Sequence, residues 1–225
     1  MIFVGGARMS TATVHVYTRK EEVFNSITHG IGILFSIMCL TLLVTLSSVY
    51  GNVWSIVSSC IFGFSMMMMY TASTVYHAAV PSETKKVLKR IDHIAIYFLI
   101  AGTYTPILLV LMRNPVGWSM LVAVWGLAFV GTVLKLVLTN IDGRFWSVAL
   151  YLIMGWLIIG AFKHVLDVLP PRAMLFLFLG GIFYTVGVFF YVWKSRPYTH
   201  VVWHCFVLLG SIMHFFAILF SCVFV

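Results

Sequence analysis

Seven long apolar stretches, separated by short polar segments, make up most of the sequence. A helix that crosses a membrane needs about 20 consecutive apolar residues, and each stretch is close to that length. We therefore predict seven membrane-spanning helices. The predicted spans cover residues 27–48, 54–79, 91–111, 116–138, 145–162, 173–192 and 201–225.

The segments between the spans contain residues that favour turns. These connections are short, so we expect neighbouring helices to pack antiparallel. Pro106 is the only proline inside a predicted span, and it should kink the third helix because it removes one backbone hydrogen bond. The turn segments are residues 50–52, 81–82, 114–115, 140–143, 170–171 and 196–197. Five of the seven tryptophans fall near span ends, where membrane proteins carry aromatic belts: Trp54, Trp118, Trp146, Trp193 and Trp203.

Composition supports a membrane protein and excludes several other classes. Of the 225 residues, 62% are hydrophobic and only 9% are charged, whereas a soluble domain has about 25% charged residues. Too few charges exist to cover a water-soluble surface, which excludes soluble enzymes, nucleic-acid binders and disordered chains. No cleavable secretory signal is visible, so we expect the protein to stay in the membrane. The four cysteines lie in apolar runs without paired spacing, and we interpret them as packing residues.

The distribution of Lys and Arg predicts how the chain sits in the membrane. Eleven of the fourteen basic residues lie in the N-terminal segment and in the second-to-third, fourth-to-fifth and sixth-to-seventh connections, and three lie on the opposite side. Cytoplasmic loops are enriched in Lys and Arg, so we predict a cytoplasmic N-terminus and an extracellular C-terminus. The expected protein is thus an all-α integral membrane protein, with an N-terminal tail at residues 1–25 and a seven-helix transmembrane bundle at residues 26–225.

Few polar or ionisable residues lie inside the spans, and those few are functional candidates because they are expensive to place in lipid. The second span ends with Ser73 and His77, and the third opens with Asp92. The seventh opens with His200 and His204. Because the spans alternate in direction, all five residues fall near the cytoplasmic face. With the polar residues 21–29 that lead into the first span, we therefore expect side chains from four distant stretches of the chain to meet at one depth.

These residues are suited to a metal site. His200 and His204 are four residues apart, which puts them on one face of a helix and is a common way to present two imidazoles to a metal. His77 supplies a third imidazole. Three histidines with an open fourth position form the catalytic type of zinc site, in which a bound water has a pKa of about 7. Asp92 is the best-placed proton acceptor. Ser73 lies one turn before His77 and is placed to hydrogen-bond to a metal ligand, to Asp92 or to the bound water.

Plainer interpretations of the same residues stay open. The three histidines could be interfacial residues with ordinary hydrogen bonds, and Asp92 could cap the third helix. Glu22, Asn25 and His29 share one helical stripe and, with Tyr76, are candidates to support the metal ligands, although capping and interface anchoring are the favoured account of Glu22, Asn25 and His29. Three further histidines are expected to lie outside the site: His93, His164 and His214.

The same motifs resemble those of a known family. Residues 22–30, 73–77, 92–93, 102–106 and 200–204 are similar to the motifs of haemolysin III proteins. These are the bacterial branch of the progestin and adipoQ receptor-like membrane proteins, and the resemblance covers nearly the whole chain. It implies seven helices, a cytoplasmic N-terminus, and zinc held by His77, His200 and His204. Eukaryotic relatives resemble receptors, and related zinc membrane proteins hydrolyse lipid amides such as ceramide.

Our hypothesis is therefore a multi-pass protein of the bacterial cell membrane with an intramembrane zinc site. It would be a hydrolase of lipid amides or esters, with Asp92 as the catalytic base and Ser73 assisting it. The expected cofactor is zinc, and the expected partners are membrane lipids that serve as substrate or ligand. Two alternatives are a receptor-like sensor or regulator of membrane homeostasis with structural zinc, and a cytolytic, haemolytic membrane protein. The sequence gives no indication of the oligomeric state.

Overall fold

A computed structural model describes residues 17–137 and 144–223 of the chain. In these two ranges all regular structure is helical, and seven helical segments are long and apolar enough to cross a membrane. The prediction of an all-α protein with seven spans is confirmed. The helices are α1 (Arg19–Tyr50), α2 (Val53–Ala78), α3 (Glu83–Pro106), α4 (Pro115–Val137), α5 (Arg144–Trp156), α6 (Phe162–Val168), α7 (Pro171–Val192) and α8 (Thr199–Ile218).

Two helices begin earlier than their apolar stretches do. Thr18 caps α1, and its side chain and that of Glu21 form a reciprocal capping box, so the helix starts at Arg19. Residues 19–25 of the expected N-terminal tail are therefore helical, and residues 1–16 lie outside the described part. Ser82 caps α3 by accepting a hydrogen bond from the Lys85 amide. Asp92 lies more than two turns inside that helix, so the interpretation of Asp92 as a helix cap is wrong.

Three of the spans change helix type along their length. α3 continues past Pro106 as a π-helical turn, Ile107–Leu111, because proline donates no backbone hydrogen bond and crowds the preceding turn. The expected distortion at Pro106 therefore takes the form of a widened turn. The fifth span consists of α5, a 3₁₀ segment at Leu157–Ala161, and α6. α8 likewise ends in a π-helical turn at Leu219–Val223.

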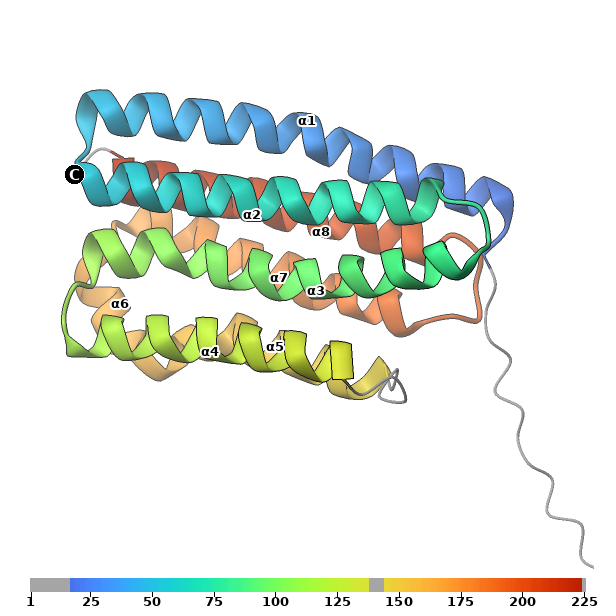
Figure 1. Ribbon diagram of the computed structural model, residues 1–225. Helices are drawn as coiled ribbons and strands as arrows, with labels where there is room; N and C mark the ends of the chain where they lie inside the picture. Colours follow the sequence, from blue (N-terminus) through green and yellow to red (C-terminus); the bar gives the residue numbers. More distant parts are fainter. Residues whose placement is uncertain (1–16, 138–143, 224–225) are drawn as a thin grey trace, which may run out of the picture.

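The helices pack as an antiparallel bundle in which several sequence-distant ends meet (Figure 1). α1 lies against α2 and α8, α2 against α3, and α7 against α8. The start of α1, the α2–α3 connection and the α7–α8 connection all lie at one end of the bundle. The polar residues at these positions are thereby brought to one depth, as the sequence predicts. Which face of the membrane this end meets stays a prediction from the charge distribution.

The core of the bundle is apolar, and so is much of its outer surface. Phe62, Met66 and Tyr70 of α2 are fully buried. By contrast, the exposed fractions of Val122 and Phe129 on α4 are 72% and 69%. Large exposed apolar side chains on spanning helices are what contact with lipid requires. All four cysteines are free; Cys39 and Cys222 are buried, as expected of packing residues, whereas Cys205 is exposed.

Candidate metal centre

Three buried histidines meet at the end of the bundle where α1 begins. His77 lies in the last turn of α2, and His200 and His204 lie in the first two turns of α8. One nitrogen of each ring lies within 4.8 Å of one nitrogen of each of the others. The exposed fractions are 2% for His77, 8% for His200 and 2% for His204. The structure therefore brings together the three histidines that the sequence predicts as metal ligands.

The start of α8 is fixed by a contact with α1. Tyr198, just before the helix, has φ 61° and is the only non-glycine residue with positive φ in the described ranges. Its backbone N–H donates to Glu21 Oε1 at 2.9 Å. Because the left-handed conformation costs energy for a side chain with Cβ, this bond helps to hold it. The Glu21 carboxylate thus caps α1 and also sets where α8 begins, one residue before His200.

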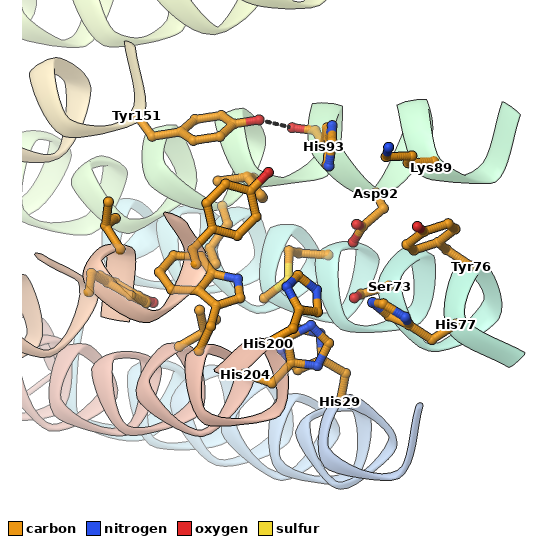
Figure 2. Close-up of a pocket in the computed structure, with 18 of the residues that line it drawn as sticks. His29, Ser73, Tyr76, His77, Lys89, Asp92, His93, Tyr151, His200 and His204 are labelled. Carbon is orange, nitrogen blue, oxygen red and sulfur yellow. Dashed lines mark hydrogen bonds between the residues drawn. The ribbon is translucent and has the colours of Figure 1, made fainter. Parts of the chain in front are cut away.

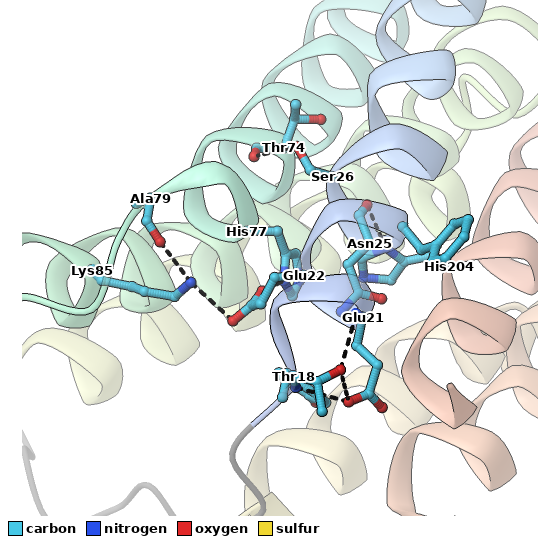
Figure 3. A network of polar contacts seen from close by, with 12 residues as sticks. Thr18, Glu21, Glu22, Asn25, Ser26, Thr74, His77, Ala79, Lys85 and His204 are labelled. Carbon is cyan, nitrogen blue, oxygen red and sulfur yellow. Dashed lines mark hydrogen bonds and ion pairs between the residues drawn. The ribbon is translucent and has the colours of Figure 1, made fainter. Parts of the chain in front are cut away.

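Two of the histidine rings are oriented by hydrogen bonds that they donate to α1 (Figure 3). His77 Nδ1 donates to Glu22 Oε2 at 2.6 Å, and Lys85 Nζ binds the other oxygen of Glu22 at 2.9 Å. His204 Nδ1 donates to the Asn25 carbonyl at 3.1 Å. Metal-binding histidines commonly donate their second ring nitrogen in this way, which fixes the tautomer and leaves Nε2 for the metal. Glu22 and Asn25 therefore contact the site as supporting residues.

The nitrogen atoms that remain fit a metal ion. His77 Nε2 and His200 Nδ1 are buried and have no hydrogen-bond partner among the described residues. An unpaired buried polar atom costs about 1–3 kcal/mol, so an arrangement with several of them calls for a further binding partner. Three neutral imidazoles form a donor set that suits zinc, and also copper, iron or nickel. The chemistry of the site therefore supports a metal without selecting which one.

Asp92 and Ser73 face the same space as the histidines (Figure 2). Both side chains are buried, and the Asp92 carboxyl points toward the Ser73 hydroxyl across the gap between α3 and α2. Tyr76 packs against His77 with 4.5 Å between ring centroids, and Lys85 Nζ lies 5.2 Å from the Tyr76 ring. A carboxylate next to three imidazoles can accept a proton from a molecule bound between them.

The histidines lie in the wall of a large cavity. Its volume is about 1260 Å³, which exceeds the ~300–1,000 Å³ of typical small-molecule pockets. It extends from Glu22 on α1 to His214 on α8, and His214 is about 15 Å along the helix from His204. Between these ends the lining is mostly apolar, with side chains such as Ile100 and Leu177. The shape suits a long apolar chain with a polar end at the histidines.

The other predicted histidines occupy distinct places. The His29 ring stacks on the His204 ring with centroids 3.5 Å apart, but His29 is not part of the group of close nitrogens. His93 lines the cavity, and its carbonyl accepts a hydrogen bond from the Tyr151 hydroxyl at 2.8 Å. His164 is exposed. His214 contacts the Leu177 carbonyl at the far end of the cavity. None of the last three joins the ligand group, as the sequence predicts.

Two residues contact the site although no feature of the sequence marks them as candidates. The Tyr17 ring lies 4.9 Å from the His200 ring, and the Tyr17 hydroxyl accepts from Lys194 Nζ at 3.0 Å. Lys85, which forms an ion pair with Glu22, lies in the first turn of α3. Both belong to polar segments at the membrane edge, where Tyr and Lys are common for reasons unrelated to a site. Only the packing of the helix ends brings them to the histidines.

Comparison with known proteins places this site in a family context. The pattern of the family described as haemolysin-III related matches residues 17–215. A protein of Bacillus subtilis (strain 168) named Hemolysin-3 homolog is 48% identical over 92% of this chain and 97% of its own length. Hemolysin-3 of Bacillus cereus is 43% identical over 89% and 91% of the two chains. The human monocyte to macrophage differentiation factor is 29% identical over 89% and 84%.

Proposed function

The chain belongs to the haemolysin-III related family of multi-pass membrane proteins, and we propose that it is a zinc-dependent hydrolase of lipid amides or esters. One observation carries the proposal: three buried histidines lie in the wall of a long, mostly apolar cavity, and His77 and His200 each have a ring nitrogen without a hydrogen-bond partner among the described residues. A structural metal site has its ligands closed around the ion, whereas a catalytic site keeps one position open. The cavity beside the histidines supports the second kind, and so favours a hydrolase over a sensor with structural zinc.

His77, His200 and His204 would hold the metal. Zinc bound there would polarise a substrate carbonyl and make water a better nucleophile near neutral pH. Glu22 keeps a proton on His77 Nδ1, so that Nε2 stays available as a ligand. The Asn25 carbonyl does the same for His204. α1 thereby supplies the contacts that orient ligands carried by α2 and α8.

Asp92 is the residue proposed to move protons. Its carboxylate would accept a proton from the attacking water and return it to the leaving amine or alcohol. Ser73, whose hydroxyl faces the carboxyl, would hold it in position for both transfers. The apolar wall of the cavity would bind the acyl chain and exclude bulk water, which strengthens the electrostatic interactions inside.

Lysis of cells is a consequence that this activity would explain. The word haemolysin in the names of the Bacillus relatives refers to those proteins. A lipid hydrolase releases single-chain products, and these would disturb a membrane without any pore made by the protein. Lysis should then disappear together with hydrolysis in the same variants, whereas a pore-forming protein would lyse cells independently of Asp92.

The test is hydrolysis of a fluorescent acyl amide and a fluorescent acyl ester by purified protein with its metal content measured. We expect activity in the wild type and a loss of ~10²–10⁴-fold in Asp92→Asn, which preserves size but accepts no proton. Asp167→Asn is the matched control, because Asp167 is exposed on α6. Full activity with full metal in Asp92→Asn would remove the proposed base. Absence of activity on both substrates in the metal-loaded wild type would favour the sensor.

A further inference from the structure

The polar end of the cavity carries more positive than negative charge. Among the described residues that line it, only Glu22 and Asp92 are acidic. Glu22 already contacts His77 and Lys85. Six lining residues are basic: Arg19, Lys85, Lys86, Lys89, Lys135 and Lys194. A cavity with this balance favours an anionic group over a neutral one.

Lys135 is the least expected of these basic residues. It lies in the last turn of α4, inside a membrane-spanning helix, and only 9% of it is exposed. A lysine that merely fixes the orientation of the protein extends its ammonium group toward water. Lys135 instead lines the cavity next to Ser147 of α5. A buried intramembrane cation is costly, and it is a candidate functional group on that ground.

Two further lysines come to the same end of the cavity from other parts of the chain. Lys89 lies one turn before Asp92 and His93 on α3 (Figure 2). Lys194, in the α7–α8 connection, has its Nζ 4.5 Å from the centroid of the Tyr191 ring and donates to the Tyr17 hydroxyl. Lys89, Lys135 and Lys194 all line the cavity that also holds His77, His200 and His204. Three ammonium groups from three segments of the chain thus belong to the wall of one cavity, the same cavity that contains the metal centre.

We propose that this region binds the phosphate of an anionic phospholipid or lysophospholipid, with the ammonium groups of Lys89, Lys135 and Lys194 around the phosphate. The acyl chain occupies the apolar part of the cavity toward His214. The glycerol ester lies between them, beside the three histidines. This assignment rests on the proposed function, since it names the class of lipid that the hydrolase holds. It selects phosphate-bearing lipids over neutral ones such as ceramide or monoacylglycerol.

The experiment compares two ether lipids that differ only in the phosphate: 1-hexadecylglycerol 3-phosphate and 1-hexadecylglycerol. The ether linkage prevents hydrolysis, so binding is measured separately from activity. Equilibrium affinities are determined for the purified, metal-loaded protein in a neutral detergent, with inorganic phosphate as a competitor. A charged hydrogen-bonding partner changes affinity by about tenfold or more. We therefore expect the phosphate lipid to bind at least about tenfold more tightly than its neutral analogue.

Variants identify the residues responsible. Lys135→Met should reduce the preference for phosphate toward one, and Lys135→Arg should retain most of it. Lys20→Gln is the matched control, because Lys20 is exposed at the same end of the bundle and does not line the cavity. The comparison of the two lipids on the wild type needs no variant, so the proposal can still be tested if Lys135→Met fails to fold.

Three results would overturn the assignment: equal affinity for both lipids, a preference that survives in Lys135→Met, or displacement of the lipid by inorganic phosphate at similar concentrations. The last result would assign the site to a free anion. Hydrolysis of lipids without any preference for phosphate would support the proposed function and reject this inference. A phosphate preference in a protein that hydrolyses no lipid would do the reverse.

Discussion

Removal of the Glu22 side chain tests how the metal ligands are held. Glu22 accepts a hydrogen bond from His77 at 2.6 Å and forms an ion pair with Lys85 at 2.9 Å. Glu22→Ala removes both contacts at once. Loss of a group that orients a metal-binding histidine typically costs 10–100-fold in metal affinity. This corresponds to about 1.4–2.7 kcal/mol, at about 1.4 kcal/mol per factor of ten. Glu22→Gln should cost less, because its amide oxygen can still accept from His77 Nδ1.

The assay is competition for zinc between the purified protein and a chromophoric chelator. Glu83→Gln and Glu83→Ala are the matched controls: Glu83 lies at the same end of the bundle, its side chain is 88% exposed, and it pairs with Lys86. We expect zinc affinity to fall in the order wild type, Glu22→Gln, Glu22→Ala, with both Glu83 variants at the wild-type value. An unchanged zinc affinity in Glu22→Ala would refute the reasoning, since His77 would then need no partner to act as a ligand.

Two further predictions address the fold. A reporter fused after Val225 should be active only if it is of a kind that works outside the cell, and a reporter inserted in the 82–89 segment should be active only if it works inside. The reason is that eleven of the fourteen basic residues are assigned to the cytoplasmic side. The opposite pattern of activity would reverse the predicted orientation. Tyr70→Phe should lower the thermal stability of the detergent-solubilised protein. The Tyr70 hydroxyl donates to Ser211 at 2.8 Å in the buried core, and loss of one partner there costs about 1–3 kcal/mol. Unaltered stability in Tyr70→Phe would mean that this bond contributes nothing between α2 and α8.

The spans and the meeting of the histidines could be predicted because both follow from simple rules. Apolar length identifies a membrane-spanning helix, and the alternation of direction decides which residues share an end of the bundle. His77 and the pair His200 and His204 satisfy both rules without any knowledge of packing. The i, i+4 spacing of the pair then places the two rings on one face of α8.

Helix starts were harder to predict, because apolar length marks only the part of a helix that lies in lipid. α1 extends to Arg19 and α3 to Glu83, well before their apolar stretches begin. For α1 the sequence did carry a signal, since Thr18 and Glu21 have the spacing of a capping box. The late start expected for the third helix made Asp92 look like a possible cap. The observed start, capped by Ser82, removes that interpretation.

The burial of Lys135 and the contact between the Tyr17 and His200 rings could not be predicted at all. Each depends on which helices become neighbours, and the seven apolar stretches carry no pattern that encodes this. In the sequence, Lys135 has the residue type and the position of an ordinary lysine at a membrane edge. Its burial in the cavity wall follows from how α4 and α5 pack, and this packing appears only in the structure.

The central claim is that His77, His200 and His204 bind a metal, and its most direct test is the metal content of purified protein by elemental analysis. We predict about one zinc per chain in the wild type and in His164→Ala, whose histidine is exposed and outside the group. His204→Ala should lose most of the zinc, because two imidazoles bind far more weakly than three. The variant with all three histidines changed to alanine should contain none. Stoichiometric zinc in that triple variant, or a wild type without metal after purification in zinc-containing buffer, would contradict the account.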